Sequence, residues 1–355
     1  MSFIDTHNVL LRAVAPTEPE CSPDISSSHP SVLQPSKLSY FRECSTSVEV
    51  KAHETDDPGM ELNTDHKRTL YQIGMYARNL MFENMSLFVF VIGIYGHTAR
   101  IYRFDHAGAV ASPSFNYVFH PYLLGEFYWR LVNPVVDIVD VEDGESGIVK
   151  SGKLFIVGSD TTITRTTPET LCNQWALVPA ISAHINKHDA VGIASSLQAG
   201  YTIRARFGYE PTHFRTFLSL GEPLYHSPGL FSRGTCVWSV VPVPQTISEP
   251  VRIYALKDTW RGRHRDPEAD NYHRIYKNEQ SELHGLAKCY GSVDFGELFS
   301  GHRTVCARIT DGDLDLRNRH HTRILLSPVG RKLNQFRSTK FLIEGVIDAI
   351  IGTQN

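Results

Sequence analysis

The chain lacks the cysteine patterns of a zinc site or a disulfide framework. Its six cysteines are Cys21, Cys44, Cys172, Cys236, Cys289 and Cys306. No two of them have C-x-x-C spacing, and none lies near a histidine at the spacing of zinc ligands. We therefore expect reduced, mostly buried thiols and an intracellular location, either cytoplasmic or nuclear.

The chain also lacks a long hydrophobic run and a recognisable secretory signal. The longest apolar run, Leu87 to Ile92, is far too short to span a bilayer. The first residues, Met1 to His7, contain no basic segment followed by an apolar core. These features predict a protein without membrane association.

Neither sign of charge dominates. The 355 residues include 35 Lys and Arg against 38 Asp and Glu, which gives a net charge of −3. This balance argues against nucleic acid as a partner, although a small basic groove is compatible with it. The apolar share of 41% and the chain length are sufficient for two hydrophobic cores.

The order of apolar and polar stretches predicts an α+β protein with an N-terminal α/β domain and a second, β-rich lobe. We expect a loop-rich N-terminus over 1–40, an α/β domain over 41–135, a bridging region over 136–225 and a second lobe over 226–355. Within the first domain, Thr64 to Met81 has helical periodicity, with Thr64 or Asp65 as its cap. The predicted strands of that domain cover 48–51, 87–95 and 99–105. Its second predicted helix covers 121–131.

A glycine turn followed by a strand with a lysine is predicted in the second lobe. A turn with Gly234 precedes the strand-like run Val251 to Lys257, which is followed by Asp258, Thr259 and Trp260. In kinases a glycine loop covers the phosphates and a strand lysine pairs with them. A lysine at the end of a surface strand is the alternative interpretation of Lys257.

A helix predicted around 267–278 offers a carboxylate for that lysine. Asp266 is the expected cap and Pro267 the expected first helical residue. Glu268 lies in the first turn and reaches Lys257 in this interpretation, with Asp270 and Glu279 as alternatives. The alternative explanation of Glu268 is that a negative charge in the first turn of a helix interacts favourably with the positive end of the helix dipole.

Several short sequences carry a family resemblance over roughly residues 45 to 350. They are Val48-Glu-Val-Lys51, Arg103-x-Asp105-x-Ala-Gly108, Gly158-x-Asp160-Thr-Thr162, Arg233-Gly-Thr-x-Val-Trp238, Leu256-Lys-Asp-Thr-Trp260, Arg323-x-Leu-Leu, Pro328-Val-Gly330 and Asp348-Ala-Ile. In these the chain resembles the fungal-type protein kinase family of mushroom-forming fungi. The resemblance implies a kinase-like small lobe, a hinge and the first large-lobe helix. It also implies ATP binding, with Gly234, Thr235, Lys257 and Glu268 as the binding residues.

The sequence departs from that family where catalysis takes place. The family's activity is ATP-dependent phosphorylation of protein serine and threonine. It requires a His-Arg-Asp loop, a metal-binding Asn and an Asp-Phe-Gly-like turn. The nearest match, His264-Arg-Asp266, directly follows the Lys257 strand and has the wrong context. We therefore expect weak nucleotide binding without phosphoryl transfer, or alternatively a binding or scaffold protein with a degenerate pocket.

A second constellation, near the N-terminus, is similar to the core motif of restriction-endonuclease-like nucleases. Pro23-Asp24 is followed by Glu49-x-Lys51, and Gln72 and Tyr76 share one helix face. Asp24 and Glu49 would hold Mg²⁺, with Lys51 on the same strand face as Glu49. An active nuclease, an inactive nuclease-like fold and coincidence are all compatible with this pattern.

Overall fold

The computed structural model describes residues 1–12, 20–28, 38–59, 63–133, 136–139, 146–149, 156–176, 200–208, 214–243, 252–277, 283, 285–305, 318–330 and 338–354. The chain divides into two compact units. Unit 1 comprises Met1–Thr161, Pro228–Ser232 and Phe299–Arg319. Unit 2 comprises Thr162–Ser227, Arg233–Leu298 and His320–Asn355.

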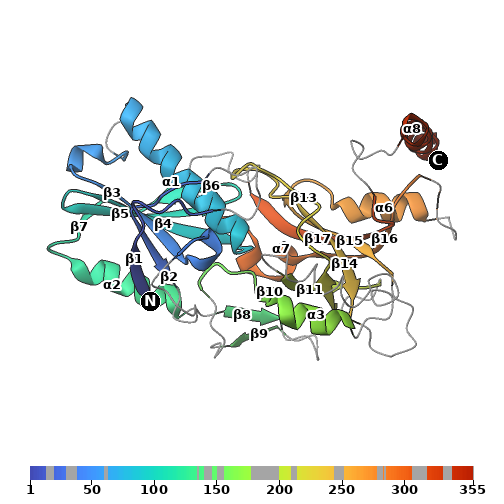
Figure 1. Ribbon diagram of the computed structural model, residues 1–355, viewed down its shortest axis with the longest axis horizontal. Coiled ribbons are helices and arrows are strands. Elements are labelled where there is room, and N and C mark those ends of the chain that lie inside the picture. Colours follow the sequence, from blue (N-terminus) through green and yellow to red (C-terminus); the bar gives the residue numbers. More distant parts are fainter. Residues whose placement is uncertain are drawn as a thin grey trace. The chain divides into compact units, whose positions relative to one another are not determined.

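Unit 1 is built on a seven-stranded sheet with the order β1-β2-β3-β4-β5-β6, in which β7 also pairs with β5 (Figure 1). Its strands are β1 (Ser2–Asp5), β2 (Ile25–Ser28), β3 (Thr46–Lys51), β4 (Phe88–Tyr95), β5 (Thr98–Asp105), β6 (Gly108–Ala111) and β7 (Phe115–Asn116). Neighbouring strands are antiparallel except β3 and β4, which are parallel and are connected through α1 (Thr64–Glu83). The other elements of this unit are η1 (Phe41–Glu43), η2 (Glu54–Asp56), α2 (Pro121–Val132), the strand pair β8 (Val136–Val139) and β9 (Ser146–Val149), and η3 (Ser300–His302).

Helix α1 forms because a polar cap precedes a continuous apolar stripe. The side chain of Asn63 accepts a hydrogen bond from the His66 N–H at 2.8 Å, so the cap lies one residue before the predicted Thr64. The stripe then packs on the sheet in the main core of unit 1, which includes Ile73, Tyr76, Ala77 and Leu80 from α1 and Val89 and Val91 from β4.

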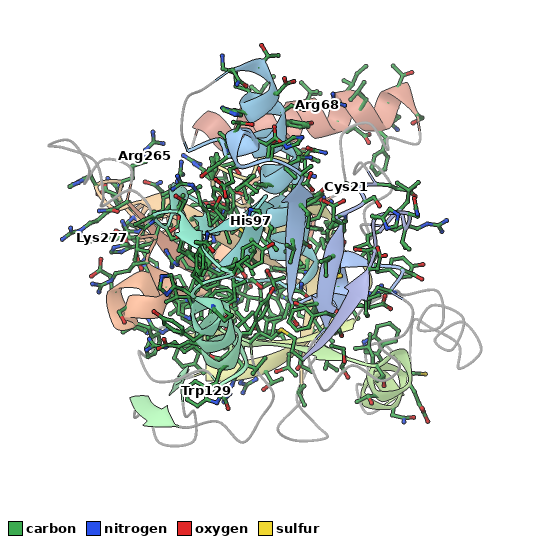
Figure 2. All side chains as sticks on the ribbon, turned by 90° about the vertical axis from the view of Figure 1, so that its left-hand side faces the viewer. Cys21, Arg68, His97, Trp129, Arg265 and Lys277 are labelled. Atoms are coloured by element: carbon green, nitrogen blue, oxygen red, sulfur yellow. The ribbon has the colours of Figure 1, made fainter. Side chains whose placement is uncertain are left out.

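Helix α2 packs on the other face of the sheet. The rings of Phe127 on α2 and Phe90 on β4 are 5.3 Å apart, and those of Tyr128 and Phe3 are 4.8 Å apart. Because Phe90 and Val91 are neighbours in one strand, their side chains point to opposite faces. In Figure 2, Arg68 on α1 and Trp129 on α2 mark the two outer surfaces of this three-layer unit.

Unit 2 contains an eight-stranded sheet with the order β10-β11-β12-β14-β15-β17-β16, in which β13 also pairs with β14. Its strands are β10 (Ile163–Thr166), β11 (Gly200–Arg206), β12 (Phe214–Ser219), β13 (Tyr225–His226), β14 (Cys236–Pro242), β15 (Tyr254–Gly262), β16 (Lys288–Asp294) and β17 (Arg319–Ser327). Its helices are α3 (Pro168–Ala176), α6 (Glu268–Tyr276), α7 (Phe295–Leu298) and α8 (Thr339–Gln354). Trp238 and Leu256, partners in the β14–β15 ladder, are both buried in its core.

Several predicted elements are present with shifted ends. The sequence suggested a strand that ends at Lys257, whereas β15 continues to Gly262 and Lys257 lies in its middle. Strand β2 lies inside the stretch that its composition predicted to be loop. For the C-terminal helix α8, the apolar periodicity over 341–351 predicts Ser338 as the cap, and the Phe341 N–H donates to Ser338 Oγ at 3.3 Å. The segments 153–157 and 303–309, whose apolar residues also predict strands, lie largely outside the described residues.

Both units combine helices with a sheet, so the described residues have the mixed α and β content of the predicted α+β class. Among the helices of these residues, none combines the length and the apolar character that crossing a bilayer requires.

Candidate functional site

Glu49, on β3, is the centre of a polar cluster between the unit 1 sheet and α1. Its carboxylate is almost completely buried. The Tyr76 hydroxyl donates to Glu49 Oε2 at 2.8 Å, and Lys51 Nζ donates to Glu49 Oε1 at 2.5 Å. Lys51 Nζ also lies 3.4 Å from Gln72 Oε1. The structure therefore brings together four residues that the sequence assigned to one motif.

Asp24, which directly precedes β2, lies beside the same cluster. Its Oδ2 accepts a hydrogen bond from the Val50 N–H at 2.7 Å. In the β2–β3 ladder Ile25 pairs with Val48, so the next step of the register places Asp24 opposite Glu49. Directly opposite residues of an antiparallel pair share a face, with Cβ atoms about 5 Å apart. The two carboxylates therefore belong to the same edge of the sheet.

The pKa of Tyr76 is shifted in the direction expected for a buried phenol next to the Glu49 carboxylate. Burial, then the charge and hydrogen bond of Glu49, and smaller effects of Cys21 and Asp24 together raise the pKa of Tyr76 well above its ordinary value. The phenol consequently stays protonated and acts as a hydrogen-bond donor. Its hydroxyl also lies 3.2 Å from the Ser22 carbonyl oxygen, which ties α1 to the segment before Asp24.

A polar cavity of about 270 Å³ opens next to Lys51. It is lined by Lys51, Asp56, Asp65, His66, Arg68, Thr69 and Gln72. Arg68 and Gln72 are four residues apart on α1 and so lie on one helix face. Arg68 was not singled out from the sequence, because a charged residue near the start of a helix usually indicates only a solvated face.

The donor set at Asp24 and Glu49 suits a hard divalent cation. Both residues offer carboxylate oxygens, which are the ligands that Mg²⁺ prefers. The ammonium group of Lys51 lies against one of these oxygens, so a bound cation would share the Glu49 carboxylate with Lys51. The residues therefore fit a Mg²⁺ site with a lysine beside it.

The second candidate site, in unit 2, contains the predicted lysine–glutamate pair. Lys257 Nζ and Glu268 Oε2 are 2.6 Å apart, and both side chains are partly buried. Glu268 is thus the partner among the alternatives that the sequence left open. Asp270 lies two residues further along α6, and Glu279 lies outside the described residues. Helix α6 begins at Glu268 with Pro267 as its cap residue, one position later than predicted.

The turn predicted to cover phosphates lies beside the end of β15. Gly234 has a φ of +49°, a left-handed conformation that favours glycine. The hydroxyls of Thr235 and Thr259 are 3.1 Å apart, and the Trp260 N–H donates to the Arg233 carbonyl at 2.7 Å. Since Thr259 and Lys257 are two residues apart on β15, their side chains point to the same face of the sheet.

Asp258, the residue after Lys257, forms a buried ion pair with Arg323 that the sequence did not predict. Arg323 on β17 binds Asp258 through two contacts, Nε to Oδ1 at 2.5 Å and Nη2 to Oδ2 at 2.8 Å. Burial alone would raise the pKa of Asp258, but Arg323 and the nearby His321 outweigh it and hold that pKa well below its usual range. The partners are 65 residues apart in sequence, so no local pattern indicates the pair.

No family model, curated protein or solved structure matches this chain. The resemblance to fungal-type kinases and the similarity to restriction-endonuclease-like nucleases therefore rest on the residues described above.

Proposed function

We propose that unit 1 is a Mg²⁺-dependent phosphodiesterase with a nuclease-like site. The observations that carry this proposal are the 2.5 Å contact of Lys51 with Glu49 and the β2–β3 register, which, continued by one residue, puts Asp24 opposite Glu49. Two carboxylates and a lysine on one sheet edge supply both a cation site and a positive charge for the phosphate.

The supporting residues on α1 hold these groups in place. Tyr76 donates to one oxygen of Glu49 while Lys51 donates to the other, so the carboxylate has a fixed orientation. Because β3 and β4 are parallel and connected through α1, that helix is held against the face that carries Glu49 and Lys51. A site built on a helix and strands keeps its geometry better than one on loops.

In this proposal each residue has a distinct part. Mg²⁺ held at this site would supply positive charge at the phosphodiester and would lower the pKa of its bound water. Asp24 and Glu49 hold the cation, and Lys51 stabilises the negative charge that develops on the phosphate. Gln72 positions the Lys51 ammonium group through the 3.4 Å contact.

The proposed substrate is a nucleic-acid strand, although the net charge argued against such a partner. The positive charge that this substrate needs is local. Lys51 and Arg68 line the same cavity as the acidic Asp56 and Asp65, and Thr69 and Gln72 offer hydrogen bonds there. A few phosphate contacts of this kind fit a protein without a large basic surface.

Cleavage of fluorescent oligonucleotides, single-stranded and duplex, tests the proposal. We expect Mg²⁺- or Mn²⁺-dependent cleavage by the full chain, with at least a 100-fold loss in Glu49→Gln and in Lys51→Ala. Glu54→Gln is the matched control, because Glu54 is a half-exposed acid on η2 outside the site. Absence of metal-dependent cleavage, or cleavage that survives Glu49→Gln, contradicts the proposal.

A second proposal concerns unit 2, which we infer binds an adenine nucleotide as a kinase-like small lobe. It is favoured by the 2.6 Å pair of Lys257 and Glu268, the arrangement that kinases need to hold ATP phosphates. It is also favoured by the left-handed Gly234 turn at the end of the strand that carries Lys257. This proposal includes the fungal-type kinase resemblance but no phosphoryl transfer.

Binding of a fluorescent ATP analogue, with a thermal-shift measurement as a second readout, tests the nucleotide site. We expect binding to weaken at least tenfold in Lys257→Ala and to be unchanged in Lys277→Ala, a control at the exposed end of α6. Failure of the wild-type chain to bind the nucleotide would instead favour a scaffold protein with a degenerate pocket. Phosphoryl transfer abolished by Lys257→Ala would contradict the expected lack of catalysis.

A further inference from the structure

Three potential metal ligands converge in unit 2, away from Lys257. Asp294 ends β16, Glu297 lies in α7 and His320 is the second residue of β17. One ligand atom from each side chain lies within 4.8 Å of the other two. His320 Nδ1 is 3.1 Å from Glu297 Oε1 and 3.7 Å from Asp294 Oδ1.

These separations agree with the dimensions of a metal centre. Zinc binds imidazole nitrogen and carboxylate oxygen at about 2.0–2.2 Å, so two ligand atoms of a tetrahedral site are about 3.4 Å apart. The observed 3.1 and 3.7 Å lie on either side of this value. An ordinary hydrogen bond between His320 and Glu297 also explains the shorter distance, and zinc titration distinguishes the two interpretations.

The backbone is adapted to bring His320 close to the two acids. Antiparallel pairing of Asp294 with Thr322 places His320 alongside the first turn of α7. A Cβ added to Gly296 would lie 2.5 Å from both Cβ and Cγ of His320. Any other residue at position 296 would therefore displace the imidazole from Asp294 and Glu297.

The Asp294 carboxylate is held in a fixed orientation by groups around the cluster. Arg261 Nε donates to Asp294 Oδ2 at 2.8 Å, and the Glu297 N–H donates to Asp294 Oδ1 at 3.1 Å. Partners of this kind orient ligands and are part of most metal sites.

We propose that Asp294, Glu297 and His320 bind a divalent transition-metal ion, with Zn²⁺ preferred. Zinc binds both imidazole nitrogen and carboxylate oxygen, and zinc sites with three protein ligands leave a fourth position for water. Zinc also binds mixed nitrogen and oxygen sites more tightly than manganese does. Glu297 is 60% exposed, so an ion can enter from solvent.

The proposed ion would join β16, α7 and β17 and is separate from the nucleotide site. Arg261, which contacts Asp294, lies four residues after Lys257 on β15, and this spacing corresponds to about 13 Å. The proposed ion and the nucleotide site therefore use different residues. The proposal therefore stands independently of nucleotide binding.

Calorimetric titration of the full chain with ZnCl₂ tests the proposal, in a Glu49→Gln background that removes the unit 1 carboxylate site. We expect the chain to bind one equivalent of zinc. The affinity should weaken at least tenfold in Glu297→Gln, and because this side chain is exposed, the substitution should leave the fold intact. Asp270→Asn, which changes an exposed acid on α6, is the matched control and should bind as the background does.

A second measurement follows the visible absorption of Co²⁺ in place of zinc. We expect the intense bands of a four-coordinate site, and their loss in His320→Gln and in Glu297→Gln. Unchanged zinc affinity in Glu297→Gln, equal weakening in Asp270→Asn, or no binding by the background protein overturns the proposal.

Discussion

Substitution of Tyr76 by phenylalanine tests the geometry of the unit 1 site with the smallest change. The Tyr76 side chain is 2% exposed, and its hydroxyl donates to Glu49 Oε2 at 2.8 Å. The ring would remain in the core, and only the donor would be lost. A hydrogen bond to a charged group contributes about 1.5–3 kcal/mol, and the carboxylate left behind is buried. We therefore expect Tyr76→Phe to destabilise unit 1 by about 2 kcal/mol at pH 7.

A double-mutant cycle separates this hydrogen bond from general packing effects. Tyr76→Phe and Glu49→Ala, alone and combined, should give a coupling free energy of about 1–2 kcal/mol. Native-state hydrogen exchange of α1 and β3 amides reads the stability of unit 1 without the complication of two units that unfold separately. A coupling energy within about 0.3 kcal/mol of zero would refute the direct contact between Tyr76 and Glu49.

Three further predictions concern unit 2. Arg323→Met should destabilise it by about 3–5 kcal/mol in urea denaturation, because the buried Asp258 carboxylate loses its partner. Since the folded-state pKa of Asp258 is depressed, its contribution is present above its unfolded pKa of about 3.9 and is lost as the pH falls towards the folded value. Urea midpoints measured from pH 5 down to pH 2 should therefore decline less steeply in Asp258→Asn than in the wild type, and equal slopes would contradict this linkage. Gly234→Ala should cost about 1–2 kcal/mol, because an alanine must adopt the φ of +49°, and an unchanged melting temperature would argue against that conformation.

Local patterns were sufficient to predict helix α1 and the shared strand face of Glu49 and Lys51 in unit 1. The stripe that includes Ile73, Ala77 and Leu80 predicted α1, and these residues are fully buried in its core. The two-residue spacing of Glu49 and Lys51 predicted their shared face, which the 2.5 Å contact confirms. Both inferences depend only on helix and strand periodicity.

Features that depend on partners remote in sequence were not predictable in this way. Lys257, Asp258 and Arg261 bring charge into β15, so the sequence suggested that the strand ends at Lys257. Each charge is paired in the structure, with Glu268, Arg323 and Asp294 respectively, and the strand therefore continues to Gly262. Strand β2 was missed for a related reason, because its buried residues, Ser26 to Ser28, are polar and give no hydrophobic signal.

The most direct test of the unit 1 site is a titration with Mn²⁺, followed by the EPR signal of the free ion. It is made in the Glu297→Gln background, so that binding in unit 2 does not contribute. If Asp24 and Glu49 hold one ion, Asp24→Asn and Glu49→Gln each weaken binding at least tenfold, while Lys51→Met retains binding and loses cleavage. Binding in Asp24→Asn as tight as in the background protein would contradict the account, because the two carboxylates would then not share a site.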